Sequence, residues 1–240
     1  MEDEEYTEPA PPTAEKVARR AVVLSVISCR GVVEGDKANS QGREDLVKRS
    51  RDWLFGLGVE NELSAWERGI LETPFGDLTS RDRINASWLS EAMTVLAWAL
   101  GKIEMPAYDE QCDPADVANS LGFIEDASET VLKFPVLRAT AALNEYNEFI
   151  YNIHWRVRDF SINQNAYDFE SLARKAWGEP VLRHGLKIAE KDLCVGGVPI
   201  SQADERDWRT LSSITRERHR ASNWLIGYAS EDFYEVTTDT

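Results

Sequence analysis

Apolar positions recur at helical spacing along most of this chain, and the pattern predicts a succession of helices. A stripe from Val17 to Leu24 predicts a helix over 14–34, for which Thr13 is a suitable N-cap. Further helices are expected over 43–56, from about Ser64, over 80–100, over 114–120, over 168–178 and over 203–227. The second half of the 80–100 segment is apolar on nearly all sides, which indicates a helix buried by several neighbours.

The longest regular signal lies between residues 135 and 163. Its apolar residues alternate steps of three and four without interruption: Val136, Ala139, Leu143, Tyr146, Ile150, Ile153, Val157 and Phe160. This heptad-type pattern predicts one long central helix of roughly 27 residues that packs lengthwise on other helices, with Pro135 in its first turn.

One short stretch has the pattern of β structure. Residues 192–195 and 198–201 flank the dipeptide Gly196-Gly197, which is typical of a tight hairpin, and Pro199 confines its strand to an edge. This hairpin is expected to be the only β structure. The predicted fold is therefore mainly α, a single-domain multi-helix bundle over 13–240. Residues 1–12, acidic and rich in proline, are expected to form a disordered tail.

The most informative property of the composition is the net charge, because it limits the possible binding partners. The chain has 240 residues, of which 42% are hydrophobic and 10% aromatic, and a formal net charge of −15. Such a chain folds as a globule, and nucleic-acid phosphates and anionic membranes repel it. A basic protein partner or a small molecule is the more compatible ligand.

Targeting signals and cysteine usage indicate a cytoplasmic protein. The chain begins Met-Glu-Asp-Glu-Glu, unlike a basic signal peptide, and its longest mostly apolar stretch, 92–101, is about half the ~20 residues that span a bilayer. The three cysteines, Cys29, Cys112 and Cys194, are widely spaced, so no disulfide framework is expected.

The last predicted helix contains a run of charged and ionisable residues at 216–220. At 100° per residue, Arg218 falls in the middle of the apolar arc, close to Leu225, whereas Arg216 and Arg220 point away from it. Arg218 is therefore expected to be the buried member of the run, and a buried guanidinium needs a partner.

Three kinds of partner are open for Arg218. Glu91, at the edge of the apolar helix, is the first choice, and Asp239 or the terminal carboxylate of Thr240 is the second. Either would make a structural ion pair. The third is an anionic ligand at the base of a cleft.

A second candidate surface lies on one flank of the predicted long helix. Asn147, Tyr151, His154 and Arg158 follow each other at steps of four, three and four, so they either line a cleft or cover the side of a packed helix. A carboxylate-bridged metal pair needs Glu-x-x-His on two helices, but Tyr151 stands three residues before His154. No metal and no cofactor are expected, because phosphate-cradling and nucleophile-elbow motifs are also absent. The three histidines look isolated in the sequence, and His184 is expected at the surface.

Five blocks of the sequence carry a family resemblance. They are RSRDWLFGLGVENELSAWERGILE at 49–72, SEAMTVLAWALG at 90–101, LRATAALNEYNEFIYNIHWRVRDFSIN at 137–163, DLCVGGVPISQA at 192–203 and ERHRASNWLIGYASEDFYEVTTDT at 217–240. The chain resembles the bacterial proteins of domain of unknown function 4272, although Phe233-Tyr234 stands where that family has Trp-Asp.

The resemblance implies a bacterial, soluble, mostly helical protein and carries over no catalytic residue. It also implies that five of the candidate residues belong to the shared architecture: Glu91, His154, Arg218, His219 and Asp239.

Two functions follow from these observations. The first is a non-enzymatic acidic protein that binds a basic protein partner, as an adaptor or immunity protein does. The alternative is an enzyme or small-molecule binder. Its polar cleft would be built from Glu91, His154, Arg218 and His219, and Tyr151, Arg158 and Asp239 complete the candidate network.

Overall fold

The computed structural model describes residues 9–35, 40–176 and 185–239, and these are mainly helical with a small antiparallel sheet. The mainly α prediction is confirmed. The chain divides into two compact units. Unit 1 contains residues up to Pro12, Ala107–Glu110 and the chain from Ala139 onward, and unit 2 contains Thr13–Pro106 and Gln111–Arg138. The single domain expected over 13–240 stays a prediction, and the tail expected over 1–12 lies for the most part outside the described residues.

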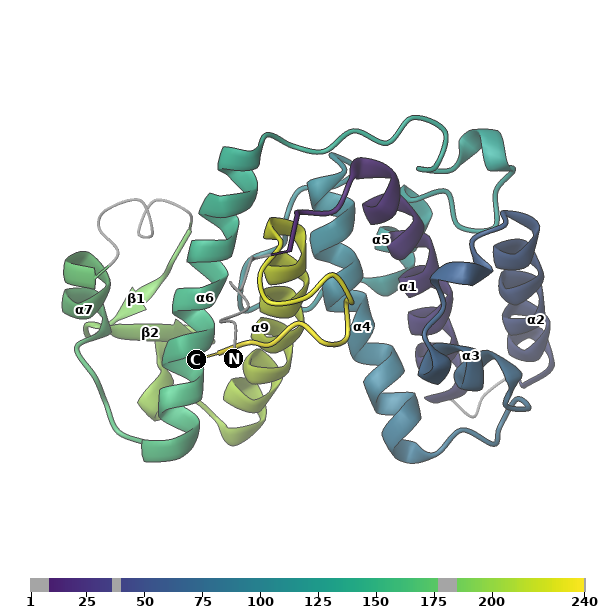
Figure 1. The fold of residues 1–240 in the computed structure, drawn as a ribbon. Helices are drawn as coiled ribbons and strands as arrows, with labels where there is room; N and C mark the ends of the chain where they lie inside the picture. The colour runs from purple at the N-terminus through teal and green to yellow at the C-terminus, as the bar shows by residue number, and fades with distance from the viewer. Residues whose placement is uncertain (1–8, 36–39, 177–184, 240) are drawn as a thin grey trace, which may run out of the picture. The chain divides into compact units, whose positions relative to one another are not determined.

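Unit 2 is built around two buried helices. Its elements are α1 (Ala14–Gly35), α2 (Ser40–Gly56), η1 (Glu60–Glu62), α3 (Ala65–Glu72), α4 (Ser80–Ala99), α5 (Pro114–Ser120) and η2 (Ala127–Glu129). Helices α1 and α4 lie side by side (Figure 1). Their backbones approach so closely at Gly31 that a Cβ there would lie 2.4 Å from the backbone nitrogen of Ser87. The core of unit 2 is the contact between these two helices.

The predicted helix starts in unit 2 are largely confirmed. Ser64 and Glu67 form a capping box at α3, in which each side chain accepts a hydrogen bond from the other residue's backbone N–H. Asp113 caps α5, with Pro114 in the first turn. Helix α2 begins at Ser40, earlier than residue 43, and residues 36–39 lie outside the described part of the chain.

The long-helix prediction is wrong at its start. Helix α6 begins at Thr140 and has 24 residues, and Val136 is 71% exposed. The backbone N–H of Arg138 donates to the carbonyl of Ala99 at 2.8 Å, and its Nε donates to the carbonyl of Trp98 at 2.8 Å. Because Arg138 binds carbonyls at the end of α4, the residues before Thr140 stay extended instead of joining the helix.

Unit 1 packs two long helices against a small sheet. Its elements are α6 (Thr140–Asn163), α7 (Phe169–Ala176), β1 (Ile188–Ala189), β2 (Asp192–Val195), β3 (Val198–Pro199), η3 (Ile200–Gln202) and α9 (Glu205–Ile226). Helices α6 and α9 run antiparallel. Phe160 near the end of α6 contacts Trp208 near the start of α9, and Asn147 near the start of α6 bonds to Asn223 near the end of α9.

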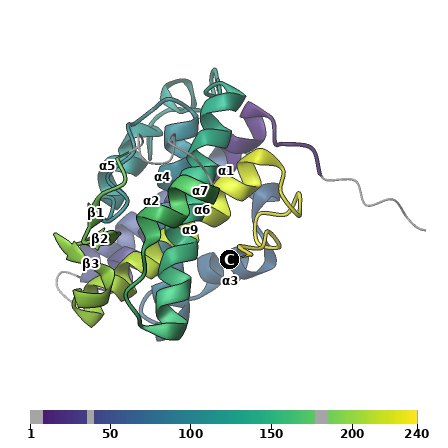
Figure 2. The same cartoon turned by 90° about the vertical axis from the view of Figure 1, so that its left-hand side faces the viewer.

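The sheet has the antiparallel order β1-β2-β3 (Figure 2). The predicted hairpin is β2 and β3, joined by Gly196 and Gly197, which both have positive φ angles. Pro199 lies on an edge strand, as predicted. The expectation that this hairpin is the only β structure was wrong, because strand β1 pairs with β2. Its two residues are too few to show alternation in the sequence.

Candidate functional site

The charge run on α9 is more deeply buried than the helical geometry predicted. Arg218 is 1% exposed, which confirms its place in the apolar arc, and the Arg216 side chain is 56% exposed. However, Glu217 and His219 are buried as well, so the expectation of one buried member was wrong. Neighbouring elements cover more of the circumference of α9 than the apolar arc in its own sequence indicates.

The C-terminal segment accounts for part of this cover. The guanidinium of Arg220 lies 5.1 Å from the ring centre of Phe233 and 5.4 Å from that of Tyr234. Arg220 also pairs with Glu217, which accepts a 3.2 Å hydrogen bond from Arg216. Glu217 is thus a buried carboxylate held between two arginines of its own helix.

Arg218 donates hydrogen bonds to backbone carbonyls. Its Nη1 lies 3.0 Å from the carbonyl oxygen of Ala107, and its Nη2 lies 2.7 Å from that of Glu110. Glu91 belongs to unit 2, where it is 1% exposed and accepts from the backbone N–H of Cys112 at 3.0 Å. The expected pairing of Glu91 with Arg218 stays a prediction.

The other expected partners lie at the end of the chain. The carboxylate of Asp239 accepts from the hydroxyl of Tyr228 at 3.1 Å and from that of Thr237 at 3.0 Å. The terminal carboxylate of Thr240 lies outside the described residues.

Tyr108 fixes the segment to which Arg218 binds. Its hydroxyl donates to the carbonyl of Cys194 on β2 and lies 3.2 Å from the carbonyl of Lys187. Burial raises the pKa of the Tyr108 phenol, so the side chain remains a neutral donor. The sheet therefore holds residues 107–110, and this places their carbonyls where Arg218 reaches them.

His154 and His219 contact each other, and the expectation that the histidines are isolated was wrong. Their Nδ1 atoms are 2.9 Å apart and their rings cross at 75°. In a neutral pair one Nδ1 carries the proton and donates, and the other accepts, so the two rings hold complementary tautomers. His184 lies outside the described residues.

Both imidazoles are held neutral. Burial, helped by the positive charges of Arg216 and Arg158, lowers the pKa of His154 to about 4. Burial and the neighbouring His154 lower the pKa of His219 to about 3, opposed by a hydrogen bond between His219 and Asn223 and by the charge of Asp239. At neutral pH both rings are therefore uncharged, and the pair is a poor proton donor.

A polar network surrounds the pair. The side-chain amide of Asn147 donates to Ser222 at 3.0 Å and to Asn223 at 2.7 Å, and Asn223 donates to the carbonyl of Thr237 at 2.9 Å. The Tyr151 ring meets the His219 ring edge-on at 5.5 Å. The predicted stripe thus turns Asn147, Tyr151 and His154 toward α9, and its last member, Arg158, is exposed.

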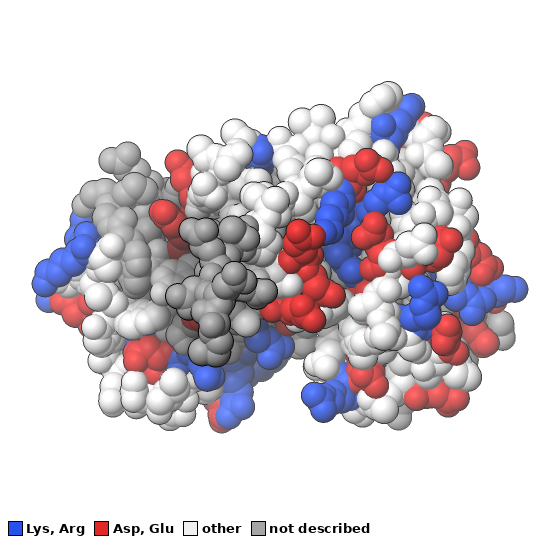
Figure 3. Space-filling view, in the orientation of Figure 1, with Lys and Arg blue, Asp and Glu red and all other residues white. Residues whose placement is uncertain are grey.

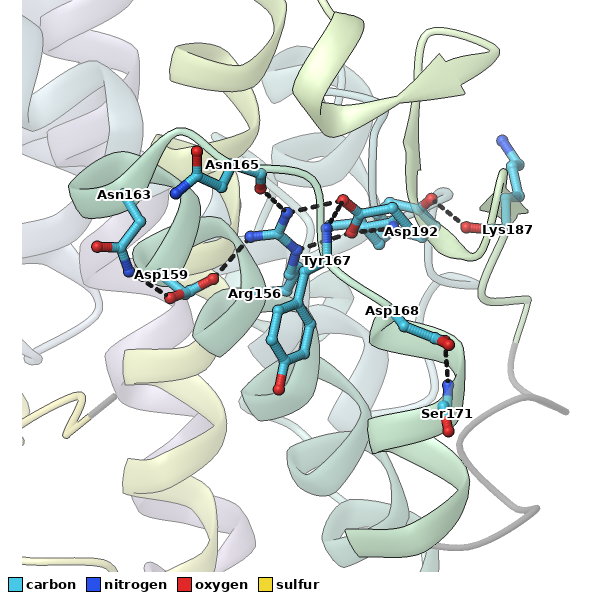
Figure 4. A network of polar contacts seen from close by, with 11 residues as sticks. Arg156, Asp159, Asn163, Asn165, Tyr167, Asp168, Ser171, Lys187 and Asp192 are labelled. Atoms are coloured by element: carbon cyan, nitrogen blue, oxygen red, sulfur yellow. Dashed lines mark hydrogen bonds and ion pairs between the residues drawn. The ribbon is translucent and has the colours of Figure 1, made fainter.

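Sequence reasoning missed a second polar cluster, centred on Arg156 (Figure 4). Arg156 is fully buried, and its Nε and Nη2 each lie 2.7 Å from one carboxylate oxygen of Asp192. Its Nη1 donates to Asp159 at 2.8 Å, and Nη2 also donates to the carbonyl of Asn165 at 2.8 Å. The backbone N–H of Tyr167 donates to Asp192 as well. This two-pronged pair fastens β2 to α6, and no local pattern indicates it.

The surface cavities lie away from helices α6 and α9. Three surface cavities of about 420, 360 and 260 Å³ lie in unit 2, and no residue of α6 or α9 lines them. Cys29, Cys112 and Cys194 form no disulfide, and burial raises the pKa of the Cys29 thiol to about 11. In the described part of the chain, no three metal-ligating side chains gather, and no helix has both the length and the apolarity to cross a membrane.

Comparison with known proteins assigns the family. The chain matches the model of the family described as domain of unknown function (DUF4272) over residues 3–175, and it belongs to that family. Three of the five resembling blocks lie in this range, and the blocks at 192–203 and 217–240 lie beyond it. No curated protein and no solved structure matches the chain.

Proposed function

We propose that this chain is a non-enzymatic cytoplasmic protein that binds a basic protein partner, as an adaptor or immunity protein does. The observation that carries the proposal is the charge balance of the interior. Among the described residues, the buried arginines are Arg20, Arg30, Arg156 and Arg218, and the buried carboxylates are Glu67, Glu91, Asp192 and Glu217. These charges cancel, so the excess of −15 rests on residues outside that interior.

One exposed segment of unit 2 carries negative charge only. Residues 111–132 contain no lysine or arginine, and all their acidic residues are exposed: Asp113, Asp116, Glu125, Asp126 and Glu129. The face shown in Figure 3 carries both acidic and basic side chains. A one-signed segment attracts a basic surface and speeds its association.

The chemistry of the buried groups also supports binding over catalysis. General acid–base catalysis at neutral pH needs a group whose pKa lies near 7 and that reaches a substrate. His154 and His219 are both buried, with pKa values lowered to about 4 and about 3. Arg218 is bonded to backbone carbonyls of its own chain.

The test is capture of a partner at low salt. The immobilised chain is expected to retain a basic protein from the host lysate, and the affinity of the purified pair should fall steeply between 50 and 300 mM salt. The control replaces the five acids of 111–132 by Asn or Gln, which keeps an N-cap at 113 and should weaken binding at least tenfold. Binding that ignores both salt and this variant would contradict the proposal.

The second candidate is the enzyme or small-molecule binder with a cleft around Glu91, His154, Arg218 and His219. The contact between His154 and His219 favours it, because two of these four residues meet. If it is correct, a library of anionic metabolites should contain a ligand that raises the Tm, and His219→Gln should abolish that shift. A library without effect on the Tm would count against this function.

A further inference from the structure

A surface cavity of unit 2 combines acidic and apolar walls. It has a volume of about 260 Å³ and lies among α3, the turn that follows it and the start of α4. Its lining residues are Trp66, Gly69, Ile70, Thr73, Asp77, Leu78, Thr79 and Asp82. We refer to it as the Trp66 pocket.

One carboxylate of the pocket is held in a fixed orientation. The indole Nε1 of Trp66 donates to Asp82 at 3.0 Å, and the hydroxyl of Thr79 donates to the other carboxylate oxygen at 2.6 Å. These hydrogen bonds, from Thr79 first and Trp66 second, lower the pKa of Asp82 and keep it ionised. Each carboxylate oxygen retains a further lone pair for a ligand.

Helix α3 lines the pocket with the exposed glycine Gly69. A Cβ built on Gly69 would meet no atom within 4 Å, so any side chain at this position would occupy open space. Glycine in the middle of a helix costs about 0.5–1 kcal/mol relative to alanine. Helix α3 thus loses a little stability at a position that lines the pocket.

We infer that the Trp66 pocket receives an arginine or lysine side chain of the basic partner, an inference that rests on the proposed function. Asp82 and the exposed Asp77 supply negative charge, and Trp66, whose indole is an aromatic ring of the kind that attracts cations, lines the pocket. Ile70 and Leu78 provide apolar contact for the aliphatic stem of the incoming side chain. A volume of about 260 Å³ is below the ~300–1,000 Å³ of small-molecule sites and suits one side chain.

The test uses an amidated hexa-arginine peptide as the probe and the Trp66 indole N–H as the reporter. In ¹H–¹⁵N spectra at low salt, this resonance, identified by its loss in Trp66→Phe, should shift saturably as the peptide is added. Gly69→Leu fills the pocket without touching the carboxylates, and it should lower peptide affinity about tenfold, the effect typical of blocking an interface hot spot. Asp82→Asn should do the same. Glu44→Gln removes one exposed carboxylate from α2, away from both the pocket and residues 111–132, and it should leave affinity within about twofold.

The outcomes separate the pocket from the wider proposal. Peptide that binds Gly69→Leu as tightly as the wild type, without moving the Trp66 resonance, would overturn the pocket inference and leave the basic-partner proposal standing. The same holds if a basic partner is captured and the peptide does not bind. If neither a basic partner nor the peptide binds at low salt, both proposals fall. The Tm of Gly69→Leu, expected to equal or exceed that of the wild type, shows that the variant is folded.

Discussion

His154 on α6 and His219 on α9 share one hydrogen bond through their Nδ1 atoms, 2.9 Å apart, although 65 residues separate them in the sequence. The contact requires that at least one of the two rings is neutral, because two imidazoliums at this distance would present only donors and repel each other. Since Asn223 and Tyr151 also contact His219, protonation of the pair would strain the interface between α6 and α9.

Stability should therefore fall on acidification. The folded-state pKa values of His154 and His219, about 4 and about 3, lie below the 6.5 of an unperturbed histidine. The contribution of the neutral pair is fully present above pH 6.5 and is lost as pH falls toward 4, because the unfolded chain then binds more protons. Each histidine contributes a slope of up to about 1.4 kcal/mol per pH unit.

Urea unfolding between pH 7.5 and pH 4.5 measures this slope. Carboxylates titrate in part of the same range, so the matched comparison is His219→Asn, which removes one titrating ring. A variant whose free energy of unfolding depends on pH as steeply as that of the wild type would show that the histidines do not control acid stability.

Arg156 should be essential for the stability of unit 1. Replacement of Arg156 by Ala leaves Asp192 as a buried carboxylate without its cation, and this costs about 3–5 kcal/mol of unfolding free energy. Arg158, two residues further along α6, is exposed, and its replacement by Ala should change stability by less than about 0.5 kcal/mol. Equal unfolding midpoints in urea for the two variants would contradict the assignment of Arg156 as a buried clasp.

Arg218→Ala should be destabilising through the loss of its hydrogen bonds to the backbone alone. The substitution removes the hydrogen bonds from the guanidinium to the carbonyls of Ala107 and Glu110, and each hydrogen bond from a charged donor contributes about 1.5–3 kcal/mol. We expect a loss of at least about 3 kcal/mol by thermal or urea unfolding. Arg209→Ala on the same helix removes an exposed pair with Glu205 and should cost less than about 0.5 kcal/mol. An unchanged Tm for Arg218→Ala would mean that this side chain is exposed in solution.

Two glycines of unit 2 should respond oppositely to alanine. A Cβ on Gly31 would lie 2.8 Å from the carbonyl carbon and from the Cβ of Ala86, so Gly31→Ala should push α1 and α4 apart and cost about 1–3 kcal/mol. Gly69→Ala places its methyl in open space and should stabilise α3 by up to about 1 kcal/mol. The two variants differ from the wild type by the same methyl group. A Tm that moves in the same direction for both would argue against the close contact of α1 with α4.

The sequence by itself determined the features that depend on near neighbours. The capping box of Ser64 with Glu67, the cap of α5 by Asp113 and the Gly196-Gly197 hairpin each form within four residues, so their spacing predicts them. The burial of Arg218 follows equally from the 100° step of a helix. Local hydrogen bonds and helical periodicity are properties of short segments, which explains why these predictions are confirmed.

Only the tertiary structure decided which distant polar groups meet. Arg156 and Asp192, 36 residues apart, pair because the β2 strand lies beside α6. Nothing in the sequence around either residue indicates the other as its partner. Helix α6 begins at Thr140 because Arg138 binds the carbonyls at the end of α4, against a periodicity that continues back to Val136. His154 meets His219 for the same reason. A buried polar group binds the partner that the packing of whole elements brings within hydrogen-bond distance. The free energy of that packing is a sum over the entire core.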